Sequence, residues 1–181
     1  MDLQEFNSEM LYFQEPIDPE VEILVNRAAQ NYGPASEDLL LKAREIAEND
    51  LTVLIGLYRY YYYQNRYLDG VAIAFNVMAV VGNKIGFPES WKEITLSDVT
   101  RGILHSFCLV RLYFFALKAA GYLQLRLGNY EEGRAMIEKV VAMDSKDRLG
   151  AQLLLDVLDN NKADVIAFQP RQEWRHANGT V

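Results

Sequence analysis

The sequence predicts an all-α protein built from antiparallel helical hairpins. Apolar residues recur at helical spacing, as at Val21, Leu24 and Val25. Segments that contain glycine, asparagine or proline separate the helical stretches, as at Gly33-Pro34. Half of the 181 residues (50%) are apolar, which is enough for one sizeable core.

Residues 1–16 are predicted to be an acidic N-terminal arm. They carry several acidic residues and no lysine or arginine, together with Phe6, Tyr12 and Phe13. Such a segment has the composition of a flexible arm whose aromatic residues suit docking on a surface.

Residues 17–50 predict the first hairpin. Pro19 suits the first turn of a helix, and Gly33-Pro34 ends that helix. Ser36 is the candidate cap of the second helix, which is followed at 51–82 by another hairpin.

The segment at about 83–97 is interpreted as an insertion that folds back over the helices. It contains proline, glycines and an isolated Trp91. We expect Trp91 to plug the hydrophobic core, with a ligand contact as the alternative. A helix capped by Ser97 or Asp98 is then expected to run unbroken to Leu127.

Residues 111–147 predict the most regular hairpin. The first helix ends at the segment 127–130, and a second helix follows at once. Gly121 and Gly133 lie on facing sides, where the missing side chains let the backbones approach. A glycine inside a helix costs roughly 1 kcal/mol relative to alanine, which a close helix contact offsets.

After this hairpin, residues 148–159 predict a final helix. We therefore place one helical domain at 17–160 and a C-terminal tail at 161–181, where Pro170 stands and no helical period is sustained.

The hairpin at 111–147 resembles a tetratricopeptide (TPR) repeat. Gln124 and Ser145 depart from the usual aromatic residue and proline of the repeat pattern. The resemblance implies a right-handed array of hairpins with a C-terminal capping helix, and an irregular helical bundle is the alternative. The matching positions are Leu117, Ala120, Gly121, Gln124, Gly133, Ile137, Val140 and Ser145.

The same frame fits residues 51–82 and, one repeat earlier, residues 17–50. Gly70 then corresponds to Gly133. Tyr58 stands where the repeat has a small residue, so we expect looser packing in that hairpin.

The resemblance also predicts a binding groove. Six tyrosines between 58 and 67 cannot all face one side of a helix. In some TPR domains lysine and asparagine clamp a C-terminal carboxylate, and here Lys118 matches only the lysine. A second interpretation is that the tyrosines pack against the insertion. The predicted groove residues are Arg59, Tyr62, Tyr63, Phe115, Lys118, Tyr122 and Arg126.

The composition limits the classes of partner that we expect. A net charge of -7 disfavours broad attraction to nucleic acid or to an anionic membrane. We expect a protein or peptide partner that carries acidic and aromatic residues, with homo-oligomerisation through the acidic arm as a further prediction. One cysteine and an acidic N-terminus indicate a cytoplasmic protein.

No catalytic or metal-binding pattern stands out, so we expect a non-enzymatic protein without a cofactor. His105 and Cys108 are three residues apart, but no second pair completes a metal site, and we expect both to be packed. The alternative function is a small-molecule sensor or enzyme with a pocket between the insertion and the helix at 98–127, around His105.

Two narrower likenesses suggest a context. Small acidic TPR proteins include bacterial secretion chaperones, which hold an extended segment of a partner. The phrases LYRYYYYQNRYLDG and FALKAAGYLQLRLGNYEEG are similar to those of uncharacterised bacterial TPR proteins found near nitrogen-fixation genes.

Overall fold

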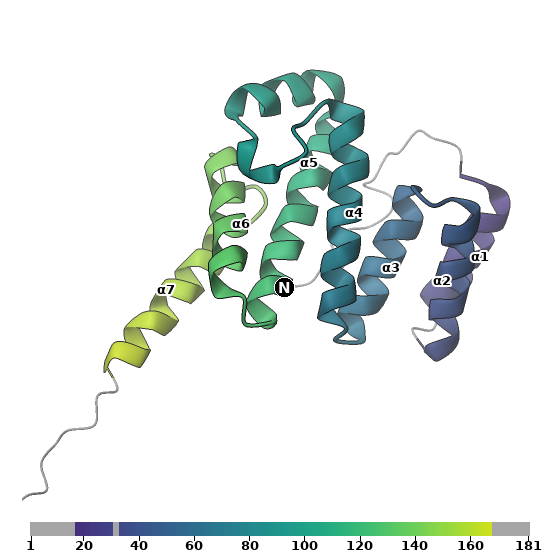
Figure 1. Ribbon diagram of the computed structural model, residues 1–181, viewed down its shortest axis with the longest axis horizontal. Helices are drawn as coiled ribbons and strands as arrows, with labels where there is room; N and C mark the ends of the chain where they lie inside the picture. The colour runs from purple at the N-terminus through teal and green to yellow at the C-terminus, as the bar shows by residue number, and fades with distance from the viewer. Residues whose placement is uncertain (1–16, 31–32, 168–181) are drawn as a thin grey trace, which may run out of the picture.

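The computed structural model describes residues 17–30 and 33–167, with side chains up to residue 160, and within these the chain is all-helical. Each helix packs against the next along the chain (Figure 1). The all-α prediction is therefore confirmed. The helices are α1 (Pro19–Gln30), α2 (Pro34–Ile46), α3 (Leu51–Tyr63), α4 (Tyr67–Ile85), α5 (Leu96–Arg126), α6 (Tyr130–Met143) and α7 (Gln152–Ala167), with a 3-10 turn, η3, at Trp91–Glu93.

Short turns make antiparallel hairpins of α1 with α2, α3 with α4, and α5 with α6. The buried apolar core is most extensive on α3, α4, α5 and α6. The acidic arm and the chain beyond residue 167 lie outside the described residues, so the predictions made for them stay predictions.

The start of α2 differs from our expectation. Pro34, which we expected to end the first hairpin's leading helix, occupies the first turn of α2 behind Gly33. Proline suits this position because its missing N–H would have no partner inside the helix. Ser36 is buried within the helix and is not its cap.

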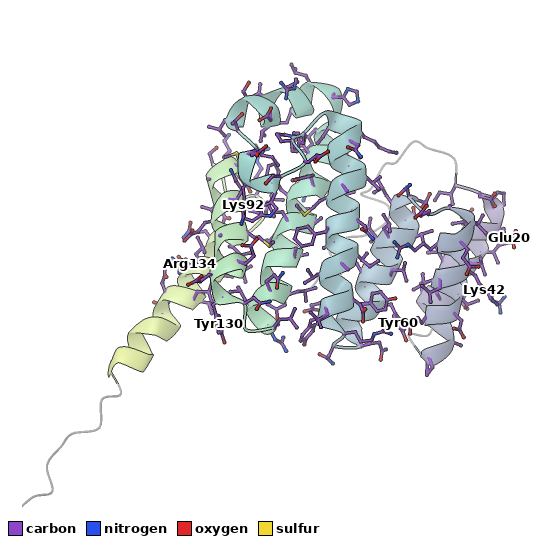
Figure 2. All side chains as sticks on the ribbon, viewed as in Figure 1. Glu20, Lys42, Tyr60, Lys92, Tyr130 and Arg134 are labelled. Atoms are coloured by element: carbon purple, nitrogen blue, oxygen red, sulfur yellow. The ribbon has the colours of Figure 1, made fainter. Side chains whose placement is uncertain are left out.

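The insertion covers one end of the hairpins. Trp91 is buried, with 8% of its surface exposed, which confirms that it plugs the core. Lys139 on α6 donates hydrogen bonds from Nζ to the carbonyls of Lys92 and Ile94, at 2.8 and 2.9 Å. Lys92, labelled in Figure 2, pairs in turn with Glu132 at 3.2 Å.

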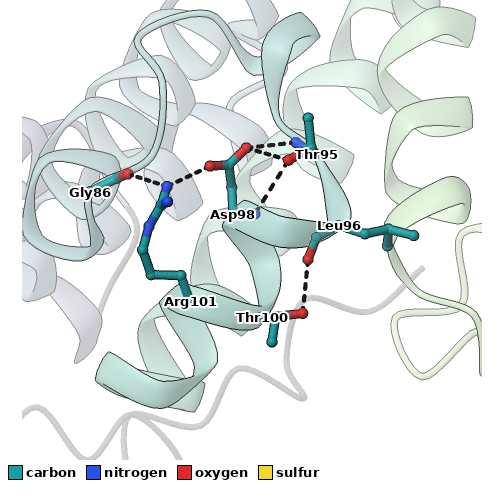
Figure 3. Close-up of polar contacts among 6 residues, drawn as sticks. All are labelled: Gly86, Thr95, Leu96, Asp98, Thr100 and Arg101. Carbon is teal, nitrogen blue, oxygen red and sulfur yellow. Dashed lines mark hydrogen bonds and ion pairs between the residues drawn. The ribbon is translucent and has the colours of Figure 1, made fainter.

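Thr95 caps α5, two or three residues earlier than the expected Ser97 or Asp98. The Asp98 carboxylate accepts from the Thr95 backbone N–H at 2.9 Å, and the Thr95 hydroxyl accepts from the Asp98 N–H at 3.3 Å (Figure 3). Arg101 joins Asp98 at 2.5 Å and reaches the Gly86 carbonyl at 3.4 Å. Hydrogen bonds from Thr95, and then Arg101, lower the pKa of Asp98.

The long helix is broken, contrary to our expectation. Ser106 has extended backbone angles (φ -160°, ψ 109°) inside α5. Its Oγ accepts a hydrogen bond from the Leu109 N–H at 3.3 Å, as an N-terminal cap does. α5 therefore consists of two helical segments that meet at Ser106, and the first lies across one end of the molecule in Figure 1.

The predicted glycine contact between α5 and α6 is confirmed. A Cβ placed on Gly133 would lie 2.8 Å from the Gly121 carbonyl oxygen, and one placed on Gly121 would lie 3.0 Å from the Gly133 oxygen. Only glycine at both positions lets the two backbones come this close.

The last helix lies later in the chain than we predicted. It starts at Gln152 and continues to Ala167, into the segment expected to be a tail. Asp147 precedes it and accepts from the N–H groups of Ala151 and Gln152, at 2.8 and 3.1 Å. Arg134 on α6, labelled in Figure 2, pairs with Asp159 on α7 at 2.6 Å.

α4 and α5 are long and apolar enough to cross a membrane by length and composition, and half (50%) of each span is buried within the protein. Core helices of soluble proteins pass the same test, so this observation is weak evidence for a span.

Candidate functional site

The tyrosines of α3 point to different sides. Tyr58, Tyr60 and Tyr61 are buried, whereas Tyr62 is half-buried and Tyr63 is 39% exposed. This distribution follows from the turn of about 100° between successive helical residues. The run is therefore partly core and partly surface.

One face of α3 meets α5 through aromatic rings. The Tyr62 ring lies 6.3 Å from that of Tyr58 and 6.3 Å from that of Tyr122 on α5. Tyr63 packs its edge on Tyr62 at 5.5 Å. These contacts place three predicted groove residues, Tyr62, Tyr63 and Tyr122, side by side.

Arg126 contacts Tyr122 of this group. Its guanidinium donates to the hydroxyls of Tyr122 at 3.0 Å and Tyr67 at 2.7 Å, and lies 4.8 Å from the centre of the Tyr67 ring. Hydrogen bonding to Tyr122 raises the pKa of Arg126, so the side chain stays charged. Among the described residues no carboxylate pairs with Arg126.

Lys118 corrects the predicted groove. The residue is buried, with 5% of its surface exposed, and its Nζ donates to the Leu149 carbonyl. The ammonium also lies 5.2 Å from the centre of the Phe115 ring. Lys118 therefore holds the connection between α6 and α7 against α5 and does not line an open groove.

A small hollow lies between α3, α4 and α5. Its volume is about 40 Å³, and Arg59 and Phe115 from the predicted groove line it. By this measure a volume of about 10–15 Å³ already holds one water, so the space fits a small group. The remaining lining residues are Ile55, Tyr58, Ala74, Val77, Leu112, Ala116 and Ala119.

Two polar atoms beside this hollow have no hydrogen-bond partner among the described residues. They are the Tyr58 hydroxyl and Arg59 Nε, and both are buried. A buried polar group without a partner costs roughly 1–3 kcal/mol.

Burial also determines the charge of Tyr58. Desolvation, and then the neighbouring hydroxyls of Tyr62 and Tyr122, raise its pKa well above the ordinary value. The hydroxyl is therefore protonated at neutral pH and can donate. The Tyr58 hydroxyl and Arg59 Nε are thus two buried donors, and each is suited to a carboxylate or a carbonyl oxygen.

Sequence reasoning missed part of this site. It placed Arg59 and Phe115 on the groove, but it treated Tyr58 only as a packing irregularity. Leu112 and Ala119 escaped notice because they read as ordinary core positions. Their spacing of seven residues on one face of α5 was the available signal.

The structure does not support the His105 prediction of a packed side chain. His105 is exposed and Cys108 is half-buried. No group of three or more His, Cys, Asp or Glu within the described residues could hold a metal ion.

Two larger hollows lie elsewhere. One, of about 460 Å³, lies between α4 and the insertion and is lined by Phe87, Trp91 and Tyr113. The other, of about 500 Å³, lies between α5 and the connection from α6 to α7. His105 lines neither of them.

Comparison with known proteins gives one informative similarity. The chain is 47% identical over 168 residues to the "Uncharacterized 19.8 kDa protein in nifW 5'region" of Azotobacter chroococcum mcd 1. The match covers 93% of this chain and 94% of that protein. No protein-family model matches the chain. No solved structure gives a significant match.

Proposed function

The chain belongs to the family of that Azotobacter chroococcum protein, and we propose that it is a non-enzymatic, TPR-like protein-binding module. In this proposal it acts as an adaptor or chaperone that holds an extended segment of a partner between α3 and α5. The proposed groove consists of Arg59, Tyr62, Tyr63, Phe115, Tyr122 and Arg126.

The arrangement of the hairpins supports the TPR-like part of the proposal. Three antiparallel pairs follow one another and α7 comes last, where a repeat array needs a cap. The contact between Gly121 and Gly133 occurs where the repeat frame requires small residues.

The pair of unpartnered donors is the observation that carries the binding proposal. Tyr58 and Arg59 place a buried hydroxyl and a buried Nε beside an apolar hollow. Buried donors without a partner are unfavourable, and a bound segment would supply the missing acceptor.

The chemistry of the groove indicates the kind of segment. The hollow of about 40 Å³ admits one small apolar side chain. Arg59 and Arg126 favour a carboxylate nearby, and Tyr62 and Tyr122 offer rings for aromatic contact. The expected partner is therefore a polypeptide with acidic and aromatic residues, not nucleic acid or membrane.

Residues 1–16 of the chain have this composition. We propose that the arm, with Phe6, Tyr12 and Phe13, occupies the groove of its own or a neighbouring molecule until a partner replaces it. Deleting the arm should then increase the affinity for an acidic peptide and reduce any self-association measured by sedimentation.

Selection from a library of short random peptides tests the proposal on the full chain. The bound peptides should share a carboxylate next to an apolar or aromatic residue. The substitution Arg59→Gln should lower the affinity for a selected peptide about tenfold, as expected for the loss of one charge-assisted hydrogen bond.

Lys42→Gln on α2 is the matched control, because it removes one exposed positive charge outside the groove. Equal losses in Arg59→Gln and Lys42→Gln would contradict a specific site. So would selected peptides without acidic residues.

The name of the relative refers to the nifW 5' region. This agrees with the nitrogen-fixation context suggested by the sequence likeness, and we propose a bacterial, cytoplasmic protein that works in that context.

A further inference from the structure

The hollow of about 500 Å³ has an apolar floor. It lies where the two segments of α5 meet and faces the connection between α6 and α7. Its volume is in the usual range of small-molecule sites. We call it the kink pocket, and its floor is formed by Val99, Ile103, Phe107, Val110 and Phe114.

The floor is partly open to water. Ile103 is 43% exposed and Phe107 is 49% exposed, on either side of the break at Ser106. Each of these side chains would gain free energy by contact with an apolar ligand, at about 25 cal/mol per Å² covered.

The rim of the pocket is positive although the protein is acidic overall. Arg111, Lys146 and Arg148 line it, and Asp144 is the acidic residue among its lining residues. Asp144 is already engaged, because its Oδ2 accepts from the Leu149 N–H at 2.7 Å. Within the described part of the chain, no carboxylate pairs with Lys146 or Arg148.

The connection that carries two of these cations is held in place. Buried Lys118 donates to the carbonyl of Leu149, which lines the pocket. Asp147, at a positive φ of 45°, accepts from the Ala151 N–H at 2.8 Å. The backbone on this side of the pocket is therefore formed before a ligand arrives, which lowers the entropic cost of binding.

We propose that the kink pocket binds a small amphipathic carboxylate with an aromatic or medium-length aliphatic body. The body would cover the floor at Ile103 and Phe107, and the carboxylate would reach the cations at Lys146 and Arg148. A neutral apolar ligand leaves the cations unused, and a small polar anion leaves the floor exposed. The combination of both features selects an amphiphile with one negative head.

Titration of the full chain with decanoate tests this assignment. The reporter is the amphipathic sulfonate 8-anilinonaphthalene-1-sulfonate, whose fluorescence rises in an apolar site. Decanoate below its micelle concentration should displace the reporter, whereas decanol and decylammonium should displace it at least about tenfold less effectively, because they lack the charged head that the rim pairs with.

Variants locate the site. The double variant with Lys146→Gln and Arg148→Gln should bind decanoate about tenfold or more weakly, since both charge-assisted contacts are lost. Phe107→Ser should weaken it through the loss of apolar contact. Lys42→Gln should leave the affinity unchanged, and Arg59→Gln should as well, which separates this site from the proposed peptide groove. Circular dichroism melting curves check that every variant is folded.

Several outcomes would overturn the proposal. Decanol that binds as tightly as decanoate would remove the role of the cations. An unchanged affinity in the double variant would place the ligand elsewhere. A synthetic peptide of residues 1–16 that displaces the reporter at lower concentration than decanoate would show a docking surface for the acidic arm instead.

Discussion

The hairpin of α5 and α6 and the hairpin of α3 and α4 align in the repeat frame that we proposed from the sequence, and they differ in how their helices pack. Gly121 and Gly133 bring the α5 and α6 backbones into contact. In the other hairpin a Cβ on Gly70 would instead meet a side-chain methyl of Leu123 at 2.8 Å. Tyr58 takes the place of a small residue and lines a hollow.

The difference shows how one large residue creates a candidate site. Two facing glycines seal a helix crossing, because nothing separates the backbones. Tyr58, at the corresponding position of the repeat frame, lines a hollow and adds a polar group that has no partner among the described residues. We therefore expect the contact between α5 and α6 to contribute stability, whereas the hairpin of α3 and α4 carries the candidate binding residues.

The strongest test of this comparison replaces Gly133 and Gly70, each in a separate variant, with alanine. Gly133→Ala should lower the free energy of unfolding by about 3 kcal/mol, because its Cβ would collide with backbone that cannot move aside. Gly70→Ala should cost less than about 1 kcal/mol, since the Leu123 side chain can rotate and alanine favours the helix. Denaturant unfolding measures both, and equal losses would break the comparison.

High pH gives the next effect. Burial raises the pKa of Tyr113 to about 12 and raises that of Tyr58 as well. Above the ordinary value near 10 the unfolded chain loses protons that the native protein keeps, so stability falls as the pH rises. The loss at Tyr113 should reach about 2 kcal/mol by pH 12.

Unfolding curves of Tyr113→Phe across the same pH range check this sign. The variant should lose less stability between neutral and alkaline pH than the unchanged protein. A parallel pair of curves would mean that Tyr113 ionises equally in both states.

Tyr58→Phe should have a smaller and opposite effect. Removing a buried hydroxyl that has no partner among the described residues should stabilise the protein by about 1 kcal/mol at neutral pH. The same change should weaken an acidic peptide selected on the groove. Stabilisation without any loss of binding would reduce Tyr58 to a packing residue.

Arg126→Gln should have the smallest effect on stability. Arg126 links Tyr122 on α5 to Tyr67 at the start of α4, but it does so at the exposed surface. The melting temperature should fall slightly, and less than it rises in Tyr58→Phe. A large fall would mean that this link replaces the missing backbone contact in the hairpin of α3 and α4.

Local patterns predicted much of the architecture. The three hairpins, the contact between Gly121 and Gly133 and the burial of Trp91 all followed from spacing and residue type. The break in α5 did not, because Ser106 is compatible with a helix and becomes a cap only where the backbone is extended. The cap at Thr95 was missed by two or three residues for a related reason, since Ser97 and Asp98 are equally good caps in isolation.

The candidate groove was predictable only in part. The repeat frame placed Arg59 and Phe115 on a groove, and both residues line a small hollow. Lys118 lies on α5, as Phe115 does, and the repeat frame placed it in the same groove. It is nevertheless buried against the connection before α7. No pattern within α5 could reveal this, because the Leu149 carbonyl that receives Lys118 comes from a different part of the chain.

The sequence by itself determined most of the helical segments and where two helices can touch, because helical periodicity and glycine act over a few residues. Only the tertiary structure decided which cations remain available, which tyrosines are buried and where the hollows lie. Burial and pairing depend on neighbours that other helices bring. Lys118 and Arg59 are alike in charge and predicted place, but Lys118 bonds to the Leu149 carbonyl, whereas Arg59 Nε has no partner among the described residues.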